Sequence, residues 1–97
     1  MRVEYHPAIE GELREIIQFY NQSVDGLGAE FLNEFEGQIL AITANPELWV
    51  EVEEGVHRAL MRKFPFVIYY RLVNSDLLRV TVVKHQRRHP KFGMQRE

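Results

Sequence analysis

Residues 57–85 read HRALMRKFPFVIYYRLVNSDLLRVTVVKH, and the expected architecture follows from this segment. Three runs within it are rich in β-branched and aromatic side chains, which favour extended strands. These runs are His57–Lys63, Phe66–Val73 and Leu77–His85. The connections between them, Phe64-Pro65 and Asn74-Ser75-Asp76, are short enough for tight turns between antiparallel strands. The segment therefore predicts a three-stranded antiparallel meander.

The residues before this segment carry a helical pattern. Arg2–Tyr5 alternates polar and apolar side chains and predicts a short edge strand, which ends at His6-Pro7. Apolar side chains then recur at helical spacing along Ala8–Asn21, and again from Leu27 to Asn45-Pro46. The first stripe is Ile9, Leu13, Ile16, Ile17 and Tyr20, and the second is Leu27, Phe31, Leu32, Phe35, Ile39 and Ile42. Two amphipathic helices joined by a short turn would form a helical hairpin.

The connection formed by residues 46–56 lacks a helical period, and we expect a partly extended segment that Trp49 holds against the core. The order of elements is then β-α-α-β-β-β. This order predicts an α+β fold in which the two-helix hairpin packs on one face of an antiparallel β-sheet. Residues 1–97 have the size of a single domain, and we expect the polar, basic tail of residues 86–97 to be irregular and flexible.

The composition excludes several classes of function. The chain has no cysteine, which excludes disulfides and thiolate chemistry and fits a reducing compartment. It has neither a signal-like N-terminus nor an uncharged run long enough to span a bilayer, so we expect a cytoplasmic protein. It has no phosphate-binding loop or dinucleotide fingerprint, and His85 with His89 lacks the third ligand of a metal site, so no cofactor or metal is expected. His6 and His57 are expected at helix caps or on the surface.

Charge divides the chain into two unlike halves, although the net charge is only -2. Residues 1–56 hold two arginines against twelve acidic residues, whereas residues 57–97 hold ten lysines or arginines against two acidic residues. Uneven solvated charge is common on small domains and is one explanation. The other explanation is a basic surface that binds a polyanion or an acidic partner.

Strand alternation sorts the basic residues onto one face of the expected sheet. The residues expected to face the helices are Ala59, Met61, Phe66, Ile68, Tyr70, Leu72, Leu78, Val80 and Val82. Those expected on the opposite face are Arg58, Leu60, Arg62, Val67, Tyr69, Arg71, Arg79, Thr81, Val83 and His85. Four arginines and an aromatic ring on an uncovered face would form a platform for an anionic ligand. The alternative is an outer face whose arginines only keep the sheet soluble.

Three parts of the sequence resemble a known protein family. They are the strand opening Phe64-Pro65-Phe66, the run Ile68-Tyr69-Tyr70-Arg71 and the ending His85-Gln86-Arg87-Arg88. Together with the two helices, they make essentially the whole chain similar to the RelE/ParE superfamily. Its members are the toxins of bacterial type II toxin-antitoxin modules and are sometimes labelled plasmid stabilisation proteins. RelE-like members are ribosome-dependent mRNA endoribonucleases (mRNA interferases), whereas ParE-like members inhibit DNA gyrase, and the shared fold does not distinguish the two.

For a RelE-like nuclease, the resemblance implies a catalytic set of His85, Arg62 and Arg71. Cleavage of RNA beside its own 2′-hydroxyl needs a proton acceptor, a proton donor and cations around the phosphate. Imidazole is the side-chain group that titrates near neutral pH, which makes His85 the candidate for proton transfer. Arg87 or Arg88 would then clamp the phosphate.

Departures from the nuclease pattern favour the ParE-like branch. The loop before the second strand is acidic where the nucleases carry lysines, and Gln86-Arg87-Arg88 replaces the expected aromatic residue after the last strand. The net charge is also slightly negative, whereas affinity for RNA depends on neutralising phosphates.

We therefore expect a growth-inhibiting toxin that binds DNA gyrase through its basic C-terminal half. The expected target-binding residues are Arg58, Arg62, Tyr69, Arg71, Arg79, Arg87 and Arg88. A cognate antitoxin would neutralise the toxin through a flexible amphipathic segment, and a homodimer or a heterotetramer with the antitoxin would be compatible with this. The alternatives are a RelE-like nuclease acting on mRNA in the ribosome and a non-toxic remnant that only binds an antitoxin-like protein.

Overall fold

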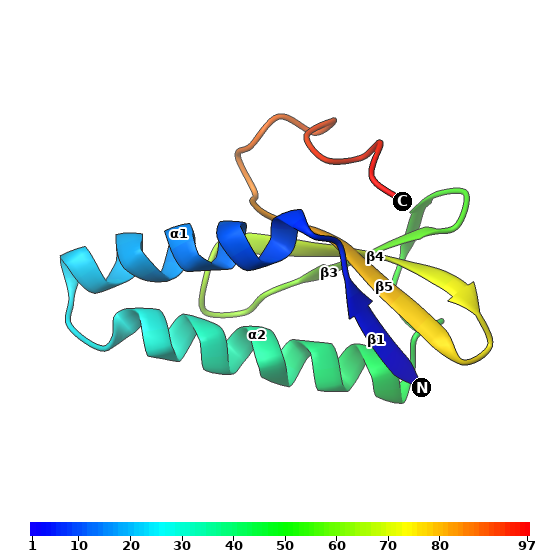
Figure 1. The fold of residues 1–97 in the computed structure, drawn as a ribbon, viewed down its shortest axis with the longest axis horizontal. Coiled ribbons are helices and arrows are strands. Elements are labelled where there is room, and N and C mark those ends of the chain that lie inside the picture. The colour runs from blue at the N-terminus through cyan, green and yellow to red at the C-terminus, as the bar shows by residue number, and fades with distance from the viewer.

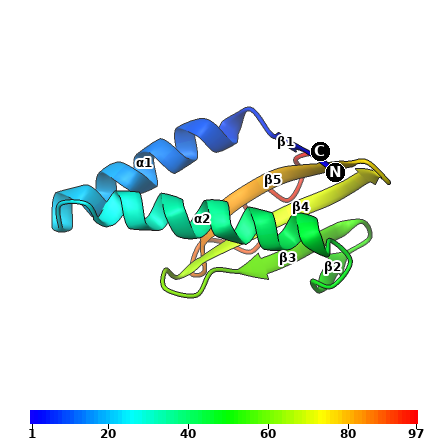
Figure 2. The same ribbon diagram turned by 90° about the horizontal axis from the view of Figure 1, so that it is seen from below.

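The computed structural model describes all 97 residues, and its elements follow one another as a strand, two helices and four further strands (Figure 1). They are β1 (Arg2–Tyr5), α1 (Ala8–Ser23), α2 (Leu27–Ala44), β2 (Glu51–Glu53), β3 (Val56–Leu60), β4 (Phe66–Asn74) and β5 (Leu77–His85). The two helices lie side by side as a hairpin against the strands, and Figure 2 shows α2 running along the sheet. The predicted α+β fold, with a helical hairpin on one face of a sheet, is confirmed.

The five strands form one sheet in the order β1-β5-β4-β3-β2. Strands β3 to β5 make the predicted three-stranded antiparallel meander. Strand β2, a short strand within the connection that was expected to be partly extended, adds a fourth antiparallel strand beside β3. Strand β1 lies at the edge, as predicted, but it pairs with β5 in parallel. A parallel pair needs a long crossover between its strands, and the chain between β1 and β5 is more than long enough for this. The sheet is therefore mixed at one edge.

The helical hairpin closes through a tight contact between its two helices. Gly26 adopts a φ of 87°, a left-handed conformation that glycine tolerates well, and α2 begins directly after it. Two residues later, a Cβ atom on Gly28 would lie 2.6 Å from the carbonyl oxygen of Ile17 in α1. The amide of Gly28 donates a hydrogen bond to the Asn21 side chain at 2.8 Å.

Neither helix combines the length and apolarity needed to cross a membrane.

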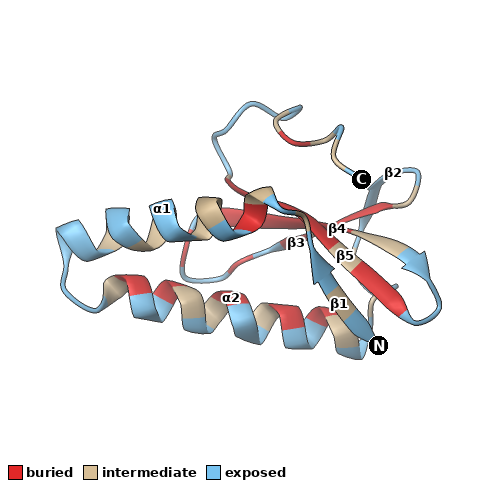
Figure 3. Cartoon of the chain, viewed as in Figure 1, coloured by how far each residue is buried: buried red, intermediate tan, exposed pale blue.

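The main core lies between the helices and the sheet (Figure 3). The buried face of α2 turns toward the central strands, which are buried as well. Tyr20, Phe31, Phe64 and Phe66 contact one another with ring centroids 4.9 to 6.2 Å apart. Trp49 packs against the main core, as expected, and so fixes the connection after α2.

The two histidines expected at caps or on the surface have different surroundings. His6 does act at a helix start, because its Nδ1 accepts a hydrogen bond from the amide of Ala8 at 3.1 Å. His57 is buried instead: its ring is stacked on Tyr70 at 5.2 Å and its Nδ1 lies 2.8 Å from the Trp49 carbonyl oxygen. The prediction was wrong for His57, which helps to hold the connection after α2 against β3 and β4.

A β-bulge in β5 exchanges its faces partway along the strand. Tyr69 of β4 pairs with Val82, whereas the next residue, Tyr70, pairs with Val80, so β5 carries one extra residue at Thr81. Val83 therefore joins the helix-side core, and Val82 joins a second cluster on the other face. The prediction had placed these two valines the other way round and was wrong for both.

Candidate target-binding site

The sheet face that points away from the helices carries arginines from three strands. Arg58 pairs with Tyr69, and Arg71 pairs with Arg79, and directly paired residues share a face. Tyr69 belongs to the second apolar cluster, which lies on this face. These four predicted side chains therefore do share one face of the sheet.

Arg62 does not belong to this face, because β3 ends two residues before it. The backbone amides of Arg62 and Lys63 both donate to the carboxylate of Glu34 in α2. These two hydrogen bonds hold the backbone of Arg62 and Lys63 beside α2, so it does not continue along the sheet. The predicted strand was too long at this end, and Arg62 lies in the loop between β3 and β4.

His85 was also expected on this face, and the bulge moves it to the other one. It pairs with Phe66, which belongs to the helix-side core, and the two rings lie 5.3 Å apart in an edge arrangement. His85 therefore stands at the end of β5 on the side of the helices.

The C-terminal tail, residues 86–97, covers much of the face that was expected to be bare. It contains no helix or strand, as predicted, and it crosses the sheet on the side opposite α2 (Figure 1). Phe92 and Met94 of the tail pack against the second apolar cluster. That cluster consists of Val56, Val67, Tyr69 and Val82. An uncovered arginine platform is thus not what the structure contains.

Two of the predicted arginines are bound within the molecule. The Nε of Arg71 donates to the carbonyl oxygen of Arg96 in the tail at 3.1 Å. Arg79 donates to the carboxylate of Glu4 in β1 at 2.8 and 3.3 Å. Each guanidinium therefore has part of its donor capacity engaged inside the protein.

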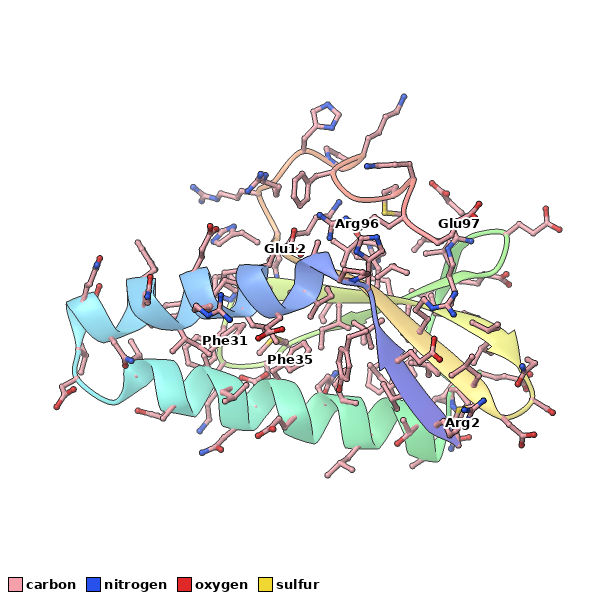
Figure 4. All side chains as sticks on the ribbon, in the orientation of Figure 1. Arg2, Glu12, Phe31, Phe35, Arg96 and Glu97 are labelled. Carbon is pink, nitrogen blue, oxygen red and sulfur yellow. The ribbon has the colours of Figure 1, made fainter.

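The end of the tail is tied to α1 by a bidentate ion pair. Arg96 donates to the two carboxylate oxygens of Glu12 at 2.9 and 2.7 Å, and to the carbonyl oxygen of Thr81 at 3.1 Å. Figure 4 shows the two side chains close together, between the tail and the start of α1. The hydrogen bonds that the Glu12 carboxylate accepts stabilise the charged guanidinium and raise the pKa of Arg96. The tail is therefore anchored at its far end.

Lys84 fixes the near end of the tail. Its side chain is buried, and its Nζ donates to the carbonyl oxygens of His89, Pro90 and Phe92 at 3.2, 2.8 and 3.1 Å. Burial, and then the positive charge of Arg88, lower the pKa of Lys84. Its three donors are used internally, but its charge adds to the positive potential at this end of the sheet.

A cleft of about 320 Å³ opens beside Lys84, between the sheet and the tail. Its lining residues are Arg58, Leu60, Val67, Tyr69, Lys84, His85, Gln86, Arg88 and Pro90. No acidic residue lines this cationic cleft. The guanidinium groups of Arg58 and Arg88 have no hydrogen-bond or ion-pair partner in the protein, and Arg88 stacks on the ring of Phe92 at 3.9 Å. The cleft therefore offers free guanidinium donors to a carboxylate or a phosphate.

A second hollow, of about 270 Å³, lies on the α1 side of the same residues. Half of its lining is apolar: Ile16, Phe19, Phe66, Val83 and Phe92. Glu12 and Glu15 of α1 also line it, and it shares Lys84, His85 and Arg88 with the cationic cleft. The end of β5 and the residues that follow thus form a ridge between a cationic cleft and an apolar hollow.

The three residues of the predicted catalytic set do not converge. Arg71 lies five residues further along β4 than Phe66, the partner of His85, so about 17 Å of strand separates Arg71 from His85. The two side chains also point to opposite faces of the sheet. Arg62 lies in the loop at the His85 end and lines neither hollow. A phosphate held by Arg71 would be out of reach of the His85 imidazole.

Arg87 and Arg88 follow β5 in sequence but have different positions. Arg88 lines both hollows, whereas the exposed Arg87 side chain lines neither. Sequence reasoning did not single out Lys84 or Phe92 for the site. The signal for Phe92 was its spacing from Met94, since two apolar residues at alternate positions in a polar tail indicate that the tail packs on something.

Comparison with protein-family models supplies the class of protein. Residues 3–90 match the toxins of type II toxin-antitoxin systems, and specifically the ParE toxin of parDE. The chain therefore belongs to the ParE toxin family, and the predicted resemblance is confirmed. Membership implies a cognate antitoxin as a partner. A comparison with curated proteins found no match.

Proposed function

We propose that this toxin inhibits DNA gyrase by binding it through the cationic cleft and the basic side chains around it. The observation that carries the proposal is a pair of guanidiniums, Arg58 and Arg88, that have no hydrogen-bond or ion-pair partner and lie in a cleft lined by no acidic residue. Because no group of the protein uses their N–H donors, both guanidiniums are available to a ligand, although Arg88 also stacks on Phe92. Family membership supports gyrase as the target because gyrase inhibition is the activity associated with the ParE-like branch.

The alternative of mRNA cleavage receives less support from the geometry. General acid-base catalysis needs proton-transfer groups within hydrogen-bond reach of one reacting phosphate. His85 and Arg71 lie on opposite faces and about 17 Å apart along the sheet. Inhibition by binding makes no such demand on their arrangement.

Because gyrase acts on the chromosome, the proposal that this toxin inhibits gyrase also requires the toxin to be present in the cytoplasm.

The proposal is tested by the supercoiling of relaxed plasmid by purified gyrase in the presence of the purified toxin. We expect inhibition, and we expect expression in cells to stop growth with double-strand breaks and an SOS response. The double substitution Arg58→Gln with Arg88→Gln should weaken inhibition by about a hundredfold or more, since each of the two charge-assisted contacts is worth about 1.5–3 kcal/mol. The matched control is Arg14→Gln, an exposed arginine on α1 outside the cleft.

Other outcomes would point to the other candidate functions. If translation stops and mRNA is cut at codon positions, and if His85→Ala abolishes cutting without unfolding the protein, the target is mRNA in the ribosome. If neither growth nor supercoiling changes, the chain only binds its antitoxin. Light scattering of the toxin with and without its antitoxin would decide between a homodimer and a heterotetramer.

A further inference from the structure

The ridge at residues 84–88 brings together two hollows of different chemistry. On one side lies the cationic cleft, whose walls include Leu60, Val67 and Pro90. On the other side lies the apolar hollow, where Phe19 is 62% exposed despite its size. Lys84, His85 and Arg88 belong to both. A ligand that crosses the ridge therefore meets guanidinium donors and an apolar surface within a short distance.

The charges around the ridge favour a single anionic group over a polyanion. A nucleic acid carries a phosphate on every nucleotide, so a strand that filled the cleft would bring its next phosphates past the ridge. There it would meet two carboxylates. Glu15 has no ion-pair partner, and the pair of Glu12 with Arg96 has no net positive charge to attract a phosphate. A chain that places one anion beside an apolar group avoids this repulsion. Peptide segments with an acidic residue next to an aromatic or branched residue have this chemistry.

We propose that the ridge binds an acidic and apolar peptide segment of the toxin's target protein, with a carboxylate in the cationic cleft and an apolar side chain in the hollow. The inference rests on the proposed function for the identity of the target, but not for the chemistry of the ligand. The carboxylate accepts hydrogen bonds from Arg58 and Arg88, and the apolar side chain packs against Phe19. The positive charge of Arg88, which helps to lower the pKa of Lys84, is the charge that such a carboxylate would balance.

The probe is a short fluorescein-labelled peptide with aspartate next to phenylalanine in a glycine-serine frame, and binding to the full chain is followed by anisotropy. Replacing the aspartate by asparagine, or the phenylalanine by serine, should weaken binding about tenfold. On the protein, Arg58→Gln with Arg88→Gln should remove the aspartate dependence, and Phe19→Ser should remove the phenylalanine dependence. The matched controls are Arg14→Gln and Leu40→Ser, because Leu40 is an exposed apolar residue on α2 that lines neither hollow. Both controls should bind as the parent does.

The outcomes separate this inference from the proposed function. Peptide binding that depends on the cleft, together with no effect on gyrase, would support the ridge as a peptide site and reject gyrase as the target. Gyrase inhibition without peptide binding, or with peptide binding that the cleft variants leave unchanged, would overturn the ridge inference alone. Tighter binding of a single-stranded oligodeoxynucleotide of the same length would overturn it too, because the cleft would then be a phosphate site.

Discussion

At the scale of single residues, Tyr70 shows how burial and one hydrogen bond set the behaviour of an ionisable group. The side chain is fully buried, its ring lies against His57, and its hydroxyl donates to the carbonyl oxygen of Pro46 at 2.5 Å. Burial raises the pKa of Tyr70 from 10.0 to about 12. The hydroxyl thus stays protonated and continues to hold the end of α2 against β4 in moderately alkaline solution.

The raised pKa predicts a loss of stability in alkali. Between pH 10.0 and about 12 the unfolded chain loses the Tyr70 proton before the folded chain does, so the free energy of unfolding falls as the pH rises. The contribution is fully present below pH 10.0. Tyr70→Phe removes it together with the hydrogen bond, and we expect the variant to be about 1 kcal/mol less stable below that range.

Urea denaturation of the parent and of Tyr70→Phe at several pH values measures this effect. Tyr5 and Tyr20 also have raised pKa values and Lys84 a lowered one, so only the difference between the two proteins isolates Tyr70. That difference should narrow as the pH rises through the range. A difference that stays constant would contradict the assigned pKa.

At the scale of elements, the sequence predicted the strands better than their faces. The bounds of β1 and β5 agree with the prediction because turn residues mark their ends. The bulge was missed, although the adjacent Val82 and Val83 break the alternation of β5 and could have indicated it. This single irregularity decides that His85 faces the helices. The prediction assumed an unbroken alternation along β5 and therefore placed His85 on the wrong face.

The tail was the other element whose role the sequence concealed. Its polar composition is typical of a loose terminus, and only the assembled sheet exposes the apolar cluster that Phe92 and Met94 cover. Likewise, the three carbonyl groups that Lys84 binds come together only once the tail has turned back. The spacing of Phe92 and Met94 indicates that the tail packs on something, but no pattern in the sequence shows the path that the backbone takes after His85. For this reason an open arginine platform was predicted, whereas the structure has a smaller cleft that the tail partly covers.

The helical hairpin gives a prediction that depends on how closely its helices approach. Gly28→Ala would place a Cβ 2.6 Å from the Ile17 carbonyl oxygen, which forces the helices apart and should cost about 1–3 kcal/mol. Gly37→Ala is the matched control, because nothing lies within 4 Å of its Cβ position in the same helix. That substitution should stabilise the protein by about 0.5–1 kcal/mol. Thermal or urea denaturation measures both, and equal stabilities for the two variants would refute the close contact.

At the scale of the whole molecule, part of the charge division is neutralised internally. Glu4 pairs with Arg79 and Glu12 pairs with Arg96, so acids of the first half hold bases of the second. These pairs, with the parallel pairing of β1 to β5, bring the two ends of the sequence together. The basic groups that remain unpaired include Arg58 and Arg88, beside the cleft. The uneven charge thus serves both the fold and the proposed site.

The pair of Glu12 and Arg96 predicts that the tail and the rest of the fold unfold together. Their side chains are only 21% and 13% exposed, so solvent screens the pair weakly. Arg96→Gln removes a bidentate contact and leaves Phe92 and Met94 poorly held over their cluster, and we expect a loss of about 1–3 kcal/mol in the free energy of unfolding. Arg14→Gln breaks an exposed pair with Glu10 and should change it by less than about 0.5 kcal/mol. Urea denaturation gives both values, and hydrogen exchange follows the tail amides separately. If Arg96→Gln speeds exchange only in residues 86–97 and leaves global stability unchanged, the tail opens as an independent, flexible cover; we expect both quantities to change because the tail covers apolar residues of three strands.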